Sequence, residues 1–235
     1  MDIQERNIEG VIEVRLTLDV AGESVPALFF VPEGFENCPT VVIQHPATSS
    51  KDDYFVRDVA LQWAGRGWIC GGLDAPMHGD RANHDPMALL RDRERFGAVA
   101  AQFAVELTAV LNTIADRYSA DLKRLGYVGY SMGSMLGIPA VAADGRFKAA
   151  AFCLVGEGGL VGVAAAPGSP VAKLGGVSVR IVGKLKDEFF SKDATEGLYA
   201  ALPGGDKDLL WLPGGHFEIG PDVIKAAGDW LTRKL

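Results

Sequence analysis

The chain has few cysteines, and this shortage excludes several kinds of site. It holds three in 235 residues, Cys38, Cys70 and Cys153, and their spacing fits no zinc-binding or redox motif. Cys70 and Cys153 fall in apolar stretches, where buried free thiols are the usual finding. We therefore expect no metal site.

Basic residues and long apolar runs are also scarce. The chain has 23 Lys and Arg against 30 Asp and Glu, a net charge of −7, so it lacks the basic stripe that binds phosphate backbones. Residues 1–7 show no basic segment followed by an apolar one, and no apolar run looks long enough to span a bilayer. We expect a cytoplasmic protein with no nucleic-acid or membrane partner. The sequence does not indicate its oligomeric state.

No internal repeat, low-complexity tract or interdomain linker divides the chain, so we expect a single domain over residues 1–235. Apolar strand-like runs alternate with helix-like runs, which predicts an α/β fold with a mostly parallel sheet covered by helices on both faces. Residues 11–20 and 25–31 predict an antiparallel hairpin before the alternating units. The clearest helical period runs from Phe96 to Ile114, and Pro221 opens a final amphipathic helix.

The most informative segment is the GxSxG pentapeptide from Gly129 to Gly133, which places Ser131 between an apolar strand and a helix-like run. A serine held on so sharp a turn leaves little room two residues before and after it, which explains the two glycines. The alternative is a glycine-rich turn whose serine only caps the helix. A serine nucleophile additionally needs a histidine to accept its proton.

Only His216, of the four histidines, follows Ser131 in the chain. Residues 209–212 predict a buried strand that Pro213 ends, so His216 is expected on a loop at the carboxyl end of that strand. An ordinary loop histidine is the alternative. Its place between the last strand and the last helix favours a catalytic base.

An acid is expected on the loop after the preceding strand, to orient the imidazole. Residues 177–182 predict that strand, and Asp187 follows it at a suitable distance. The adjacent Glu188 would point elsewhere, so Glu157, after the strand at 149–155, is the second choice.

The order Ser131, Asp187, His216 resembles that of the α/β-hydrolases, and within them the compact dienelactone-hydrolase-like and small serine carboxylesterase branch. The resemblance covers nearly the whole chain and implies an eight-stranded sheet. Dienelactone hydrolases usually carry cysteine as the nucleophile. Ser131 at that position favours a serine esterase instead.

Two backbone N–H groups are needed to stabilise an oxyanion. Met132, directly after the serine, is expected to supply one. The loop after the strand at 40–44 resembles the family's His-Gly segment with Pro46 in place of glycine, and proline has no N–H. Ala47 is therefore expected to supply the second, with Thr48 as the next choice, while His45 orients the loop.

Further side chains are expected near the same sheet edge. His78 and Arg81 follow the strand at 68–73, and they either line the pocket or stabilise their own loop. Residues 80–95 form either a small flap over the site or a solvated surface helix. Residues 156–176 leave little room for a lid, so we expect an open site.

Together these residues predict hydrolysis of a small or extended carboxylic ester through an acyl-enzyme, with no cofactor. Peptide cleavage or acyl transfer on the same three residues is one alternative. A catalytically silent α/β-hydrolase scaffold used for binding is the other.

Overall fold

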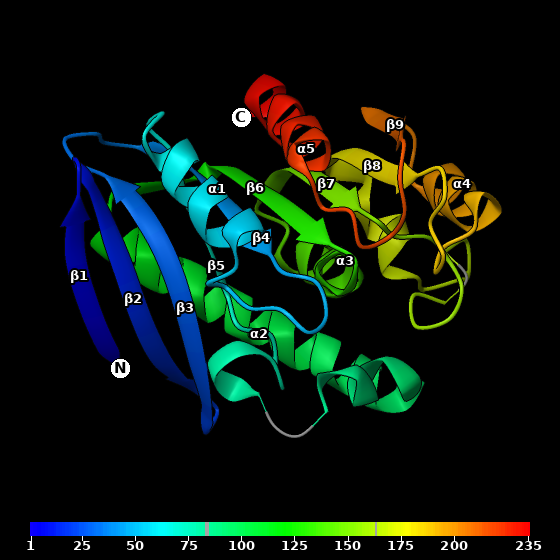
Figure 1. Cartoon of the computed structure of the whole chain (residues 1–235), viewed down its shortest axis with the longest axis horizontal. Helices are drawn as coiled ribbons and strands as arrows, with labels where there is room; N and C mark the ends of the chain where they lie inside the picture. The colour runs from blue at the N-terminus through cyan, green and yellow to red at the C-terminus, as the bar shows by residue number, and fades with distance from the viewer. Residues whose placement is uncertain (83–84, 163) are drawn as a thin grey trace.

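The computed structural model describes residues 1–82, 85–162 and 164–235. Nine strands of this part form one sheet in the order β1-β2-β3-β5-β4-β6-β7-β8-β9. The strands are β1 (Asp2–Ile8), β2 (Val11–Val20), β3 (Glu23–Pro32), β4 (Cys38–Gln44), β5 (Ile69–Leu73), β6 (Ala120–Tyr130), β7 (Phe147–Cys153), β8 (Ser178–Lys184) and β9 (Lys207–Leu212). The six strands β5, β4, β6, β7, β8 and β9 are parallel to one another. β1, β2 and β3 extend the sheet beyond β5 in antiparallel fashion. The predicted α/β class and mostly parallel sheet are thus confirmed (Figure 1).

The sheet has nine described strands rather than the eight that we expected, because β1 adds an outer strand. β1 is mostly polar and exposed, with only Ile3 and Ile8 apolar, so it carries no pattern of a buried strand. It pairs with β2 along its whole length, from Asp2 opposite Thr17 to Ile8 opposite Val11. Backbone hydrogen bonds along its whole length hold this strand in the sheet, and only Ile3 and Ile8 are half-buried against the core.

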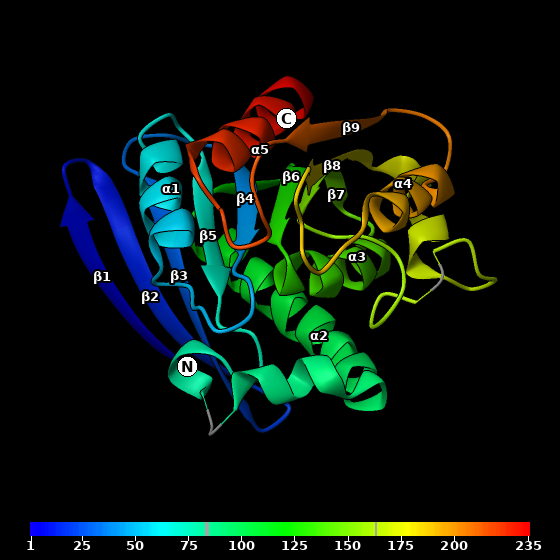
Figure 2. The same cartoon turned by 45° about the vertical axis from the view of Figure 1, so that its right-hand side comes forward.

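Helices cover both faces of the sheet. They are α1 (Tyr54–Ala64), α2 (Arg93–Arg117), α3 (Met132–Asp144), α4 (Lys192–Ala201) and α5 (Pro221–Lys234), with 3-10 turns η1 (Gly79–Arg81), η2 (Pro86–Arg91) and η3 (Pro170–Gly176). The core on one face is built from α2 and α3, and the core on the other from α1 and α5. Figure 2 shows the two helix layers on either side of the strands.

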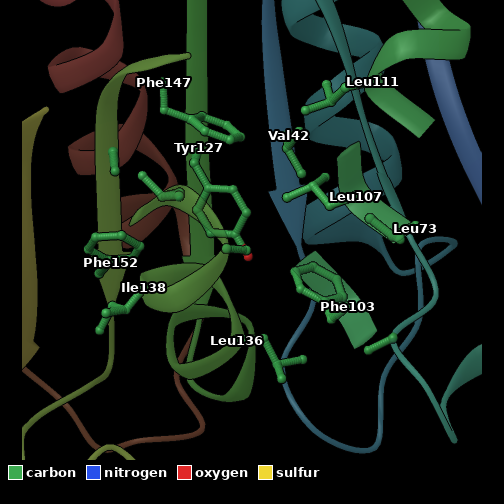
Figure 3. Close-up of a cluster of buried hydrophobic side chains, with 14 of the residues drawn as sticks. Val42, Leu73, Phe103, Leu107, Leu111, Tyr127, Leu136, Ile138, Phe147 and Phe152 are labelled. Atoms are coloured by element: carbon green, nitrogen blue, oxygen red, sulfur yellow. The ribbon is translucent and has the colours of Figure 1, made fainter. Parts of the chain in front are cut away.

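Helix α2 is long and apolar enough to cross a membrane by length and composition, contrary to what we expected of the apolar runs. Its apolar side is buried against the sheet: Phe103, Leu107 and Leu111 are at most 1% exposed. In Figure 3 these side chains pack beside Val42 of β4 and Leu73 of β5. This packing is that of a core helix on a sheet.

Helix α3 continues through Pro139 to Asp144 and does not end early. Proline removes one hydrogen bond from a helix interior, which costs about 3 kcal/mol in an isolated helix. Tertiary burial offsets that cost here, because Leu136, Ile138 and Val141 around the proline are nearly inaccessible. The helix that follows Ser131 is therefore fixed by packing.

Candidate active site

Ser131 lies on a strained turn between β6 and α3. Its backbone angles are φ 51° and ψ −111°, a region that residues with a Cβ rarely adopt. The turn is held from both sides, since the Ser131 N–H donates to the Cys153 carbonyl at 2.9 Å and the Ser131 carbonyl accepts from the N–H of Ser134 at 2.8 Å. The side chain at this point projects at the carboxyl edge of the parallel strands.

The two glycines of the pentapeptide are required by close backbone contacts. A Cβ on Gly129 would lie 2.6 Å from the carbonyl carbon of Gly133. A Cβ on Gly133 would lie 2.4 Å from the carbonyl oxygen of Gln44, at the end of β4. Both distances are far below van der Waals contact, so the turn excludes any side chain at either position.

His216 and Asp187 come together with Ser131 at this edge. The loop after β9 carries His216, whose Nε2 lies 2.7 Å from Ser131 Oγ. The loop after β8 carries Asp187, whose carboxylate oxygens lie 3.0 and 2.9 Å from His216 Nδ1. An ionised carboxylate only accepts hydrogen bonds, so Nδ1 carries the proton and Nε2 is free to accept the serine hydroxyl proton. All three side chains are at least nine-tenths buried.

Asp187 is held in its ionised form. Burial raises the pKa of this carboxyl. The hydrogen bonds from His216 and from the backbone N–H groups of Phe190 and Phe189 together lower the pKa by more, so the net pKa lies below the ordinary value. Both N–H groups donate to Asp187 Oδ1 at 2.9 Å. The charge therefore faces the imidazole at neutral pH, where it stabilises an imidazolium.

The two other candidate acids do not contact the imidazole. Glu157, our second choice, accepts a hydrogen bond from the Ala164 N–H at 2.9 Å and packs against Gly197 of α4. Glu188 instead accepts a hydrogen bond from the backbone N–H of His216 at 2.8 Å. Sequence reasoning missed this supporting role, because adjacency to Asp187 says nothing about which backbone group the side chain reaches.

The two expected oxyanion donors follow neighbouring strands. Met132 is the first residue of α3, so its N–H has no acceptor within the helix. Ala47 follows β4, which pairs with β6 as far as Gln44 opposite Gly129. Because Gly133 approaches the carbonyl oxygens of Gln44 and His45 so closely, the loop after β4 lies directly against the serine turn. Thr48, the other candidate, has a left-handed backbone (φ 62°) and an exposed side chain.

His45 is buried and holds its loop in place. Its Nε2 accepts the Ala75 N–H at 3.1 Å, so Nδ1 is protonated and donates to the Pro46 carbonyl at 2.8 Å. Burial lowers the pKa of His45 to about 4, which keeps the ring neutral. The ring thereby joins the loop after β4 to the loop after β5, as the orienting role requires.

His78 makes a hydrogen bond within its own loop, and Arg81 ties this loop to α2. His78 is buried with Nδ1 donating to the Pro76 carbonyl at 2.9 Å. Arg81 forms a two-pronged ion pair with Glu106 of α2 at 2.7 and 2.8 Å. For Arg81 the loop-stabilising alternative is the one that these contacts describe.

The segment from 80 to 95 is anchored to the core, and its residues 83 and 84 lie outside the described part. η2 packs on α2, and Leu89 is fully buried between them. Whether the segment acts as a flap stays a prediction. Within the ranges 1–82, 85–162 and 164–235, no group of three or more His, Cys, Asp or Glu side chains is placed to bind a metal ion.

Two surface hollows lie outside this cluster of residues. A groove of about 690 Å³ runs between α1 and α5 and is lined by Trp63 and Trp68. A hollow of about 320 Å³ lies against the loop that carries His216 and is lined by Tyr54, Phe217 and Ile219. Ser131 lines neither of these two hollows.

No protein-family model matches the chain, and a search of curated proteins finds no relative. Solved structures do match it. A cold-adapted esterase from an Arctic intertidal metagenomic library, in a polyethylene-glycol complex, is 26% identical with a TM-score of 0.85 over 100% of both chains.

More distant structures share the fold. A proposed dienelactone hydrolase from Klebsiella pneumoniae is 19% identical, with a TM-score of 0.72 over 95% of this chain and 99% of its own. An acetyl xylan esterase from Paenibacillus sp. R4 is 16% identical, with a TM-score of 0.73 over 100% of this chain and 88% of its own. The chain therefore has the α/β-hydrolase fold and resembles esterases of that fold along its whole length.

Proposed function

We propose that the protein hydrolyses carboxylic esters through an acyl-enzyme formed on Ser131. The observation that carries the proposal is the continuous chain of hydrogen bonds from Ser131 Oγ through His216 to Asp187, on a strained turn. The likeness to a cold-adapted esterase supports it. A backbone strained at this point, with a base already in contact with the hydroxyl, is the arrangement that a nucleophilic serine needs.

In the acylation step, Ser131 Oγ attacks the ester carbonyl while His216 Nε2 takes the hydroxyl proton. The N–H groups of Met132 and Ala47 donate to the developing oxyanion. The bond to the alcohol oxygen then breaks, and His216 transfers the proton to that oxygen. Asp187 keeps the imidazole oriented and stabilises its positive charge throughout.

In the deacylation step, water attacks the acyl-enzyme and gives a proton to the same His216 nitrogen. The carboxylic acid leaves, and the proton returns to Ser131. Every proton transfer therefore passes through His216 Nε2, the atom that lies 2.7 Å from Ser131 Oγ.

Hydrolysis of nitrophenyl esters of increasing acyl length tests the proposal, together with labelling by a fluorophosphonate. Ser131→Ala is expected to lose labelling and at least about 10⁴-fold in kcat, because no other group replaces the nucleophile. The matched control is Ser24→Ala, at an exposed position on β3, which should keep both. Full turnover by Ser131→Ala would refute the mechanism, and an inert wild-type protein would favour the silent scaffold.

A further inference from the structure

Exposed apolar side chains gather on the two loops that carry Asp187 and His216. Phe189 is 57% exposed, Phe217 is 79% exposed and Leu185 is 63% exposed. The two loops run side by side, since the N–H groups of Leu185 and Lys186 donate to the carbonyls of Leu212 and Gly214. Large exposed apolar groups that cluster in this way mark a binding surface more often than scattered ones do.

Phe189 and Phe217, which we call the aromatic rim, are packed around the imidazole. The ring centroids of Phe189 and His216 are 4.7 Å apart, and those of Phe217 and His216 are 5.7 Å apart. The two phenylalanines meet edge to face at 5.5 Å. The ring centroid of Phe190 lies 5.8 Å from that of the same imidazole, but Phe190 is half-buried against the core and is not counted in the rim.

The position of the rim selects one half of an ester. In the proposed reaction the oxyanion lies toward Met132 and Ala47, while the alcohol oxygen must lie within reach of His216 Nε2 to receive its proton. An alcohol oxygen within reach of His216 brings the rest of the alcohol next to the rings that pack on this imidazole.

Negative charge near the rim disfavours an alcohol that carries an anionic group. Glu188 and Glu218 flank the rim residues, and both carboxylates are fixed by backbone N–H groups, of His216 and Gly215 respectively. An anionic group bound at the rim would be repelled by these two carboxylates. An uncharged apolar group can cover both rings without such a penalty.

We infer that the aromatic rim of Phe189 and Phe217 binds the alcohol part of the ester and makes the enzyme selective for uncharged apolar, preferably aromatic, alcohols. The inference rests on the proposed function. It concerns the step that kcat/KM reports, because the alcohol leaves during acylation. Deacylation of a common acetyl-enzyme takes place after the alcohol has gone.

Two ester series separate the halves of the substrate. In the first, methyl, butyl and benzyl acetate vary the alcohol and keep one acyl group. In the second, methyl acetate, butanoate and hexanoate vary the acyl group and keep one alcohol. Wild-type kcat/KM is expected to rise along the first series. The ratio of kcat/KM for benzyl acetate to that for methyl acetate should fall about 3–10-fold in Phe217→Ala, which corresponds to the loss of one aromatic contact.

Phe217→Trp should keep the ratio, since it keeps an aromatic face. The matched control is Phe35→Ala, which removes an exposed phenylalanine (57%, as for Phe189) from the segment between β3 and β4 and should leave the ratio unchanged. The dependence of kcat/KM on acyl length should be the same in wild type and Phe217→Ala.

Each other outcome overturns the inference in a recognisable way. An equal fall for all esters in Phe217→Ala would show that the ring only positions His216. A change confined to the acyl series would place the rim on the other half of the substrate. A rise in rate only above the solubility limit of the ester would indicate binding of aggregated substrate. The proposed function fails separately, if Ser131→Ala hydrolyses these esters as fast as wild type.

Discussion

The carboxylate of Glu188 accepts a hydrogen bond from the backbone N–H of His216 at 2.8 Å. Glu188 directly follows Asp187, the acid that contacts the imidazole of the same histidine. Two neighbouring carboxylates therefore hold one histidine, Asp187 through the ring and Glu188 through the backbone. This second contact fixes the loop on which the imidazole stands.

Glu188→Ala removes that acceptor and is expected to lower kcat/KM about 10-fold, since a hydrogen bond to a charged group contributes about 1.5–3 kcal/mol and this side chain is exposed. Steady-state kinetics on one nitrophenyl ester measures the effect. Glu188→Gln keeps an acceptor oxygen and should retain most of the activity. Equal losses in the two variants would contradict the role of the acceptor, and Glu196→Ala on α4 serves as the surface control.

Gly133→Ala is expected to destabilise the protein by about 1–3 kcal/mol and to abolish fluorophosphonate labelling. The new Cβ would lie 2.4 Å from a backbone carbonyl oxygen, which cannot rotate away as a side chain can. The control, Gly97→Ala, is at an exposed position of α2 where nothing outside the helix's own backbone lies within 4 Å of the new Cβ, and it should stabilise the protein by about 0.5–1 kcal/mol. Urea unfolding of both variants measures the difference, and equal stabilities would contradict it.

The free energy of unfolding should fall as the pH drops from about 6.5 to about 4. Burial lowers the pKa of His45 to about 4 and that of His78 below its ordinary value, whereas both titrate near 6.5 when unfolded. In this pH window the unfolded chain therefore binds more protons than the folded chain. The stabilisation present above pH 6.5 is lost as the pH falls. His45 accounts for roughly 3 kcal/mol over the whole window.

Urea unfolding at several pH values between 7.5 and 4.5 measures this slope. The lowered pKa of Asp187 does not contribute to it, because that carboxylate loses its stabilising charge only below about pH 3.8. His45→Gln should show a shallower slope, whatever its stability at neutral pH. An unchanged slope in this variant would rule out the assignment to His45.

Lys51→Met is expected to cost about 3–5 kcal/mol of stability. The ammonium of Lys51 is buried and pairs with Asp52, Asp74 and Asp80, and Asp74 itself is fully buried. Without Lys51, the Asp74 charge stays buried with no cation beside it. Lys225→Met removes an exposed pair with Asp229 and should change stability by less than about 0.5 kcal/mol. Thermal unfolding compares the two, and similar losses would contradict the expectation.

Much of the fold could be predicted from local patterns. The hairpin at 11–31 and the strand at 209–212 have buried or half-buried apolar runs, and the structure places β2, β3 and β9 there. β1 could not be predicted in this way, because it pairs with β2 through its backbone and most of its side chains are exposed.

Side-chain partners across the fold were harder to predict. Nothing in the sequence around Lys51 distinguishes it from a surface lysine, since its burial depends on Asp74, which follows a strand 23 residues later. The exposure of Phe217 could not be predicted from the sequence either. An aromatic residue next to the candidate histidine was nevertheless a signal that could have been noticed.

The sequence by itself determined the serine turn and the chain order of the three polar side chains, because a GxSxG turn and the ends of successive strands are local features. Tertiary structure alone decided the 2.7 Å contact between Ser131 and His216, the second carboxylate on the histidine loop and the aromatic rim beside it. These features depend on how loops from β6, β8 and β9 pack at one edge of the sheet. Strand order and loop packing are set by contacts between residues far apart in the chain, and local pattern carries no record of them.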